Sequence, residues 1–302
     1  MDKSRCEKQL NTKAMKKILF SILLLLSFTS IAFCQDEEEK DKPVYSPWGS
    51  GILIDQQTSV IPSVHSFESI IQHRFGSIQS SMADLYGIYS PGANLRLGFN
   101  YVLFKNVQIG YGLTKENMYS DFNLKWTVFE QTRKNTVPVS ITLYGNMAIS
   151  GNPDKDYGLN YAFIHRYSYF SQLIIGRKIS EALSIQTAIS FTHYNSVAAD
   201  MDHDKIAWHF GGKLKFSPQS SFIFTYDLPL QIDVLSEQRE FINPPKANLS
   251  FGYEVCTGTH DFQIFLATAN GIVPQDIVLY NQSDWQLGGF SVGFVMTRLW
   301  GF

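Results

Sequence analysis

Hydrophobic and polar residues alternate with a period of two along most of the chain from residue 66 onward. In residues 93–103 the odd-numbered positions are apolar or aromatic, whereas the even-numbered positions are mostly polar residues or Gly. The same alternation returns in residues 107–114, 183–191 and 249–255. Successive side chains of a strand point to opposite faces, so this period predicts β-strands. No segment has a convincing amphipathic helical period.

The connections between these strands alternate between short turns and longer loops, with residues 116–120 as the one short exception among the loops. An even number of strands would leave both ends of the chain on the same side of a barrel. Ten or fourteen strands stay open, because residues 50–61 could add a strand and 161–178 is long. Twelve strands are predicted, at residues 66–78, 93–104, 107–115, 121–131, 137–149, 161–178, 183–194, 205–216, 221–227, 246–256, 260–270 and 285–302.

Alternation alone would also fit a soluble β-sandwich. Here the polar face is mostly small and neutral, and the apolar face carries aromatic residues toward the strand ends. A small neutral face suits a barrel interior, and an aromatic-flanked apolar face suits lipid. The predicted fold class is therefore all-β, an antiparallel up-and-down transmembrane β-barrel of about twelve strands.

Residues 1–34 have the pattern of a cleaved signal peptide. Lys16 and Lys17 precede a continuous apolar run. Ala32 and Cys34 place small residues at the −3 and −1 positions of a signal-peptidase site. The pattern predicts export to the outer membrane of a Gram-negative bacterium.

The polar residues 1–14 are interpreted as an upstream extension of the start. An alternative makes Cys34 a lipidated Cys, although Phe33 is bulky for the position before one. Residues 35–64 are expected to form a flexible acidic periplasmic segment that could also plug the barrel. Residues 65–302 are expected to form the barrel.

The composition removes several classes of protein. Of the 302 residues, 44% are hydrophobic and 14% aromatic, which excludes an intrinsically disordered chain. The net charge is −2 and no basic cluster interrupts the body of the chain, so no nucleic-acid partner is expected. After cleavage only Cys256 would remain, and a single thiol cannot form an internal disulfide or attach haem through two cysteines. No cofactor is predicted.

Charged and amide side chains on the polar faces are the candidates for a functional site. They could line a narrow pore or bind a ligand, or they could pair with one another and fill the lumen. The candidates for lining the lumen are Arg74, Arg96, Lys125, Arg166, Lys213, Glu254 and Gln263.

One acidic segment offers weak candidates for a metal site, namely Asp200, Asp202, His203 and Asp204. Carboxylates suit Ca²⁺ and imidazoles suit Zn²⁺. The spacing lacks the Gly and distal Glu of an EF-hand loop. A solvated outer loop is the preferred interpretation, and no metal is predicted.

The chain ends in a predicted strand with an aromatic stripe that includes Phe294, Trp300 and Phe302. We expect this terminal strand to be recognised by the barrel-assembly machinery. Arg298 interrupts the stripe. It could turn inward through a bulge or lie close enough to the rim to extend to water.

Several short pieces, in order over more than two hundred residues, resemble an outer-membrane β-barrel family catalogued as domain of unknown function 5777. The resemblance implies a barrel in the outer membrane of a Gram-negative bacterium. The family carries no assigned activity, so the resemblance implies no catalytic residues. The matching pieces are His73-Arg74-Phe75-Gly76, Gly92-Ala93-Asn94, Lys125-Trp126, Pro138-Val139-Ser140, Phe262-Gln263-Ile264-Phe265 and Gly293-Phe294.

Function is inferred by elimination. The sequence shows no phosphate loop, no haem motif and no nucleophile–base pair that its spacing alone would identify, so no enzyme is predicted. We expect a narrow channel or a barrel that binds or transports small solutes; the alternatives are a structural or partner-docking barrel and, remotely, a lipid hydrolase. A hydrolase would need a Ser within hydrogen-bond reach of a His at one rim, a transporter a continuous polar path, and a structural barrel a filled lumen. The expected partners are outer-membrane lipid, the barrel-assembly machinery and small anionic or zwitterionic solutes.

Overall fold

The computed structural model describes residues 41–80, 82–85, 87–89, 92–237 and 243–301. The predicted signal peptide, with Cys34, and the terminal Phe302 lie outside the described residues. No helix in these described ranges combines the length and the hydropathy needed to cross a membrane.

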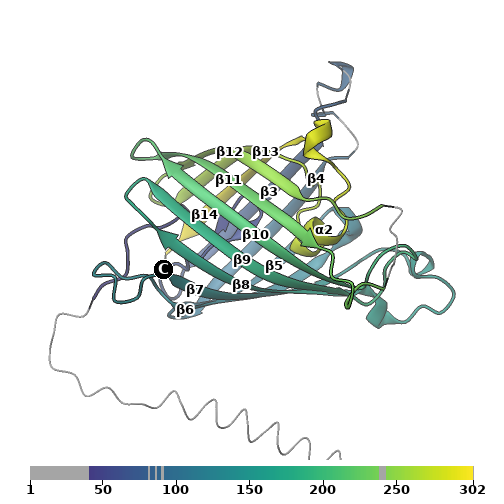
Figure 1. Ribbon diagram of the computed structural model, residues 1–302, viewed down its shortest axis with the longest axis horizontal. Coiled ribbons are helices and arrows are strands. Elements are labelled where there is room, and N and C mark those ends of the chain that lie inside the picture. The colour runs from purple at the N-terminus through teal and green to yellow at the C-terminus, as the bar shows by residue number, and fades with distance from the viewer. Residues whose placement is uncertain (1–40, 81, 86, 90–91, 238–242, 302) are drawn as a thin grey trace, which may run out of the picture. The chain divides into compact units, whose positions relative to one another are not determined.

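Twelve antiparallel strands of the described chain close into one barrel, in which each strand pairs with its sequence neighbours and β14 pairs with β3 (Figure 1). The predicted fold class and strand number are confirmed. The barrel strands are β3 (Phe67–Ser77), β4 (Asn94–Phe104), β5 (Val107–Thr114), β6 (Ser120–Phe129), β7 (Ser140–Ile149), β8 (Tyr167–Lys178), β9 (Leu183–Tyr194), β10 (Asp204–Lys215), β11 (Ser220–Leu230), β12 (Asn248–Cys256), β13 (His260–Ala267) and β14 (Ser291–Trp300).

The register places the predicted apolar face outward. Leu124 and Trp126 are 51% and 47% exposed, while Lys125 between them is 1% exposed. Leu97 and Phe99 of β4 are likewise exposed, whereas Arg96 is buried. A shift of one residue would reverse every one of these positions, so the alternation predicted the register as well as the strands.

The connections differ in length between the two ends of the barrel. At the turn end, β4 and β5 are joined by residues 105–106, where Asn106 has a φ of 62°. Asn tolerates this left-handed conformation, which two-residue hairpins require. At the loop end, residues 78–93, 150–166 and 231–247 make long connections.

A short α-helix, α2 (Pro274–Leu279), lies in the connection between β13 and β14. The sequence analysis found no helix because six residues are too few to establish a period. Pro274 begins the helix, a position that needs no backbone N–H donor. Other short elements are η2 (Met82–Asp84), η3 (Glu116–Met118), η4 (Asp154–Tyr157), η5 (Phe163–Arg166), η6 (Trp285–Leu287), β1 (Ile52–Leu53) and β2 (Gln56–Gln57).

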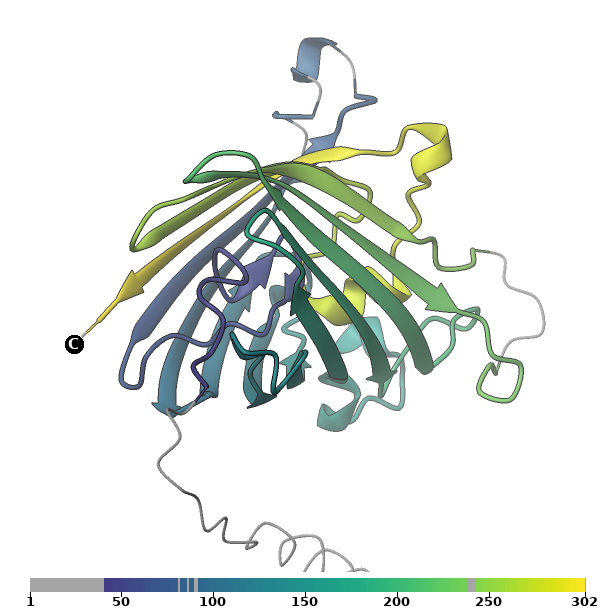
Figure 2. The same ribbon diagram turned by 60° about the vertical axis from the view of Figure 1, so that its left-hand side comes forward.

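Two parts of the chain fill the lumen. Residues 47–60, here called the plug segment, fold into a β1–β2 hairpin inside the ring of strands (Figure 2). Helix α2 folds inward from the loop end and contacts β8, β9, β10 and β11. Trp48, Ile52 and Leu53 of the plug segment pack against an apolar area of the inner wall that includes Ile223 and Phe265. The interior is therefore a packed core with both apolar and polar parts.

Candidate functional site

Wall side chains hold the plug segment through its backbone. Lys125 Nζ donates to the Gly51 carbonyl over 2.9 Å. Gln263 both donates to the Ile52 carbonyl (3.0 Å) and accepts from the Ile54 N–H (2.7 Å). Backbone groups that leave water need such partners, so these polar side chains make a lumen position possible for a non-barrel segment. The attachment is non-covalent, and the barrel closes without it.

Most of the charged candidates are paired with carboxylates. Arg96 makes a bidentate ion pair with Asp121, with Nη2 to Oδ1 at 2.7 Å and Nε to Oδ2 at 2.9 Å. Arg74 forms an ion pair with Asp55 of the plug segment. A paired guanidinium fills space and fixes geometry, but it offers less attraction to a passing anion than a free one.

Lys213 and Glu254 form a further ion pair on the inner wall. Six of the seven candidates thus have buried side chains on the inner face. Lys125 and Gln263 contact the plug segment backbone, as described above.

Arg166 is the exception and corrects the expectation that it lines the lumen. The predicted strand 161–178 begins too early, because residues 163–166 form η5 and β8 begins at Tyr167. Arg166 therefore lies at the loop end, where it pairs with Asp154. Its guanidinium carbon lies 5.2 Å from the ring centre of Tyr161.

Three of the four weak metal candidates, Asp202, His203 and Asp204, contact other protein groups. Asp202 accepts hydrogen bonds from Lys205 Nζ and from the hydroxyl of Ser236. His203 pairs with Glu237 at 2.9 Å. Within the described ranges, no group of three or more His, Cys, Asp or Glu side chains is arranged to hold a metal ion.

A vestibule of about 590 Å³ opens at the loop end. Asp276 of α2 forms part of its floor and accepts hydrogen bonds from the hydroxyls of Tyr194 (2.6 Å) and Tyr119 (3.0 Å). Burial raises the pKa of the Asp276 carboxyl to about 7, against the opposing effect of the Tyr194 hydrogen bond. The walls carry Glu116, Asn117, Ser150, Asn152, Asp156, Tyr157, His165, Arg166, Asn270, Tyr280, Asn281 and Gln282.

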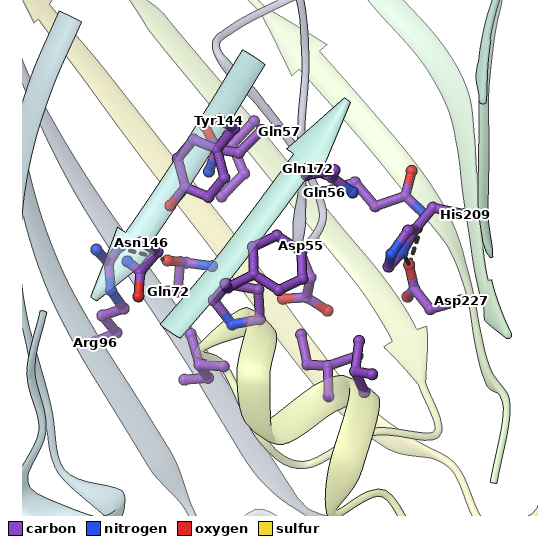
Figure 3. Close-up of a pocket in the computed structure, with 16 residues that line it drawn as sticks. Asp55, Gln56, Gln57, Gln72, Arg96, Tyr144, Asn146, Gln172, His209 and Asp227 are labelled. Atoms are coloured by element: carbon purple, nitrogen blue, oxygen red, sulfur yellow. Dashed lines mark hydrogen bonds and ion pairs between the residues drawn. The ribbon is translucent and has the colours of Figure 1, made fainter. Parts of the chain in front are cut away.

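A second cavity of about 30 Å³ lies deeper, between the plug segment and α2 (Figure 3). Ile277 and Val278 of α2 face this central cavity, while Asp276 and Tyr280 face the vestibule. Helix α2 is thus the partition between the two spaces. A cavity of this size accommodates about one water molecule, so the lumen is closed in this structure.

Of the residues of the vestibule, the sequence analysis selected only Arg166, as a candidate for lining the lumen. Tyr119, Tyr194 and Asp276 come from three separate connections or strand ends, and their contact depends on where α2 folds. No periodic or motif signal marks such positions, because loops follow no fixed period.

The closed antiparallel barrel, with apolar side chains outside and a packed, largely polar interior, defines a membrane β-barrel. Residues 49–300 match the family described as a membrane bound beta barrel domain, DUF5777, and the chain belongs to this family. The resemblance inferred from the sequence is confirmed. A search of the curated proteins finds no match.

Solved barrels share the general fold at low similarity. The NanC porin has a TM-score of 0.48 and 8% identity, over 78% of this chain and 100% of that chain. The KdgM porin has a TM-score of 0.43 and 6% identity, over 78% and 99%. An outer membrane channel from Pseudomonas putida F1 has a TM-score of 0.46 and 11% identity, over 80% and 97%. These values carry no argument about what this chain binds.

Proposed function

We propose that this protein is a gated outer-membrane barrel that takes small polar solutes into its vestibule and passes them when the lumen opens. The observation that carries the proposal is the position of α2, which has the vestibule on one side and the central cavity on the other. A short helix held by side-chain hydrogen bonds can move without breaking any strand pairing. The plug segment closes the same lumen and is also outside the strand ladder.

Three basic lumen residues bear on the class of solute. Arg74, Arg96 and Lys213 are each paired with a carboxylate. Paired charges present both signs to a solute, which favours zwitterionic solutes over simple anions if the path opens. The vestibule supports this expectation, because carboxylates, amides, an Arg and several Tyr hydroxyls share its wall.

The second candidate is a structural or partner-docking barrel, which the filled lumen favours. Export by a cleaved signal peptide and recognition by the barrel-assembly machinery belong to both candidates. In both, the outward apolar residues contact outer-membrane lipid.

Conductance in a planar lipid bilayer distinguishes the two. We expect small or rare openings from the full chain. A variant that lacks residues 41–61 should open at least tenfold more often, because the deletion removes the plug segment and leaves β3 complete. Lys125→Met is the milder companion variant, since it removes one attachment of the plug segment. If none of these proteins conducts, the channel proposal is wrong and the structural one is supported.

A further inference from the structure

Three inward-facing side chains on adjacent strands form a continuous hydrogen-bonded chain. The hydroxyl of Ser190 on β9 lies 2.7 Å from Nε2 of His209 on β10. Nδ1 of His209 lies 2.7 Å from Oδ1 of Asp227 on β11 (Figure 3). The strand register sets this arrangement, because His209 lies directly opposite Asp227 and opposite Ala188, two residues before Ser190. Ser190, His209 and Asp227 are each at most 3% exposed.

The surrounding donors define the direction of the hydrogen bond between His209 and Asp227. Asp227 also accepts from Gln56 Nε2 (2.7 Å) and from Asn248 Nδ2 (2.8 Å). An ionised carboxylate that accepts hydrogen bonds from three donors has no proton to donate, so Nδ1 of His209 carries the proton. Nε2 of the neutral ring is then the acceptor for the hydroxyl proton of Ser190. This is the tautomer that a histidine needs in order to act as a general base toward serine.

An apolar area of the inner wall adjoins the serine and histidine. Tyr144, Phe170 and Ala188 belong to it, and Val278 of α2 covers it. The ring centres of Phe170 and His209 are 6.2 Å apart. This area offers a place for an apolar group beside a nucleophile. In the closed structure α2 occupies that place.

An amide donor lies on the other side of the serine. Gln172 of β8 is directly opposite Ser190 in the strand pairing and lines the central cavity. Opposed side chains on one face of a sheet have their Cβ atoms about 5 Å apart. An amide N–H at that range can donate to an oxyanion that forms at a carbonyl bound to the serine.

We propose that Ser190, His209 and Asp227 form a catalytic triad that hydrolyses acyl esters inside the barrel. The substrate class is an ester of a short apolar acyl group with a polar alcohol. The acyl group would occupy the apolar area vacated by Val278, and the alcohol would extend toward the vestibule. The proposal is independent of conductance, because hydrolysis requires only that α2 moves.

The reaction needs only the ester and water. Ser190 Oγ attacks the ester carbonyl carbon while its proton moves to His209 Nε2. The bond from that carbon to the alcohol oxygen breaks, and the alcohol leaves with the proton from His209. Water then attacks the acyl-serine, again giving a proton to Nε2. The acyl–Oγ bond breaks, the carboxylic acid departs and Ser190 recovers its proton. Asp227 holds the ring and stabilises the imidazolium in both halves.

Access to the triad depends on the anchors of α2. The hydroxyls of Tyr119 and Tyr194 hold Asp276, which fixes the helix over the cavity. The double variant Tyr119→Phe/Tyr194→Phe removes both hydrogen bonds and retains both rings. It should loosen the helix while the barrel strands remain paired.

The test uses the full-length protein in detergent micelles, with diisopropyl fluorophosphate as the active-site probe and p-nitrophenyl butyrate as the substrate. We expect one phosphoryl adduct, located on Ser190 by peptide mass spectrometry. We also expect adduct formation and hydrolysis to be at least tenfold faster in the Tyr119→Phe/Tyr194→Phe variant. Ser190→Ala should abolish both signals, and His209→Gln should slow both at least 100-fold.

Ser168→Ala is the matched control, because Ser168 is a buried inward-facing serine of the neighbouring strand β8. The rates of adduct formation and hydrolysis in this variant should stay within twofold of the wild-type rates. Folding of every variant is checked by heat-modifiable migration on gels. The absence of an adduct on Ser190 in both the wild type and the loosened variant overturns the proposal. An unchanged adduct rate in His209→Gln overturns it as well. A protein that conducts and yet gives neither signal contradicts this inference alone.

Discussion

The buried guanidinium of Arg96 illustrates how single residues stabilise this lumen. Both of its donor groups on one edge contact Asp121, and Nη1 donates to Gln72 Oε1 over 3.0 Å. Asp121 also accepts from Asn146 Nδ2 at 2.8 Å. With every polar atom of the pair engaged, removal of either partner alone leaves a buried charge without compensation.

We therefore expect Arg96→Met to lower the free energy of unfolding by about 3–5 kcal/mol, the range found for breaking a buried ion pair. The measurement is reversible urea unfolding in lipid vesicles. Arg96→Met combined with Asp121→Leu should recover part of the loss, because both charges are then absent. Arg298→Met is the control, since Arg298 is exposed and rests on the Trp300 ring, and it should cost less than about 1 kcal/mol. Equal losses of unfolding free energy in Arg96→Met and Arg298→Met would contradict this account.

Arg298 also answers a question that the sequence left open. Its side chain faces outward near the end of β14, with the guanidinium carbon 3.6 Å from the ring centre of Trp300. The irregularity in the β14–β3 pairing lies at residues 291–293 instead. A position near the rim lets the guanidinium reach the interface without a bulge.

At the scale of elements, α2 separates the vestibule from the central cavity. Its Asp276 is buried among Tyr119, Tyr194 and Tyr280, and the negative charge of Glu116 also raises the pKa of its carboxyl. Burial favours the neutral carboxylic acid, so its pKa is raised to about 7 in the docked helix. In an undocked helix the carboxyl returns to an ordinary value near 3.8.

Docking of α2 should therefore depend on pH. Below about pH 4 the carboxyl is protonated in both states and docking is most favourable. As the pH rises toward 7, the undocked form has lost its proton while the docked form keeps it, so docking weakens. Above about pH 7 both forms are ionised and the effect is constant. We expect exposure of α2 to increase between pH 4 and pH 7 and then to level off.

The check is thiol labelling of Val278→Cys on a Cys256→Ala background, with rates corrected for the thiolate fraction. Leu287→Cys, at an exposed loop position, serves as the reference for reagent access. Asp276→Asn should remove the pH dependence, because an amide does not titrate in this range. A corrected rate for Val278→Cys that is flat from pH 4 to pH 8 would show that Asp276 does not control the docking of α2.

At the scale of the whole molecule, the outer surface contacts lipid and the plug segment does not. Trp126 is 47% exposed on the outer wall, whereas Trp48 is 2% exposed inside the barrel. In vesicles of lipid brominated on the acyl chains, we expect strong fluorescence quenching of a variant whose single tryptophan is Trp126. A variant with Trp48 alone should keep most of its emission. Comparable quenching of both would mean that residues 47–60 lie outside the lumen.

The alternation along the chain predicted the strands and the direction of their side chains, and the lengths of the connections together with the small neutral polar face favoured a barrel of about twelve strands. A period of two needs only local information, since each residue's face follows from its neighbours. Lys125 between Leu124 and Trp126 could thus be placed on the inner face without coordinates. The pattern did not predict where the loop before β8 ends. Arg166 was therefore assigned to the strand, although it lies in η5.

Tertiary structure alone decided what fills the lumen and which side chains meet there. Six residues give no helical period, so α2 and its contact with Tyr119 and Tyr194 had no signal in the sequence. Ser190 and His209 are 19 residues apart, and their 2.7 Å contact follows from the register between two strands. A motif search finds residues that are close along the chain, whereas a barrel wall brings together residues that are close only across strands. The strands were therefore determined locally, and the candidate sites depended on how those strands pair and on what folds between them.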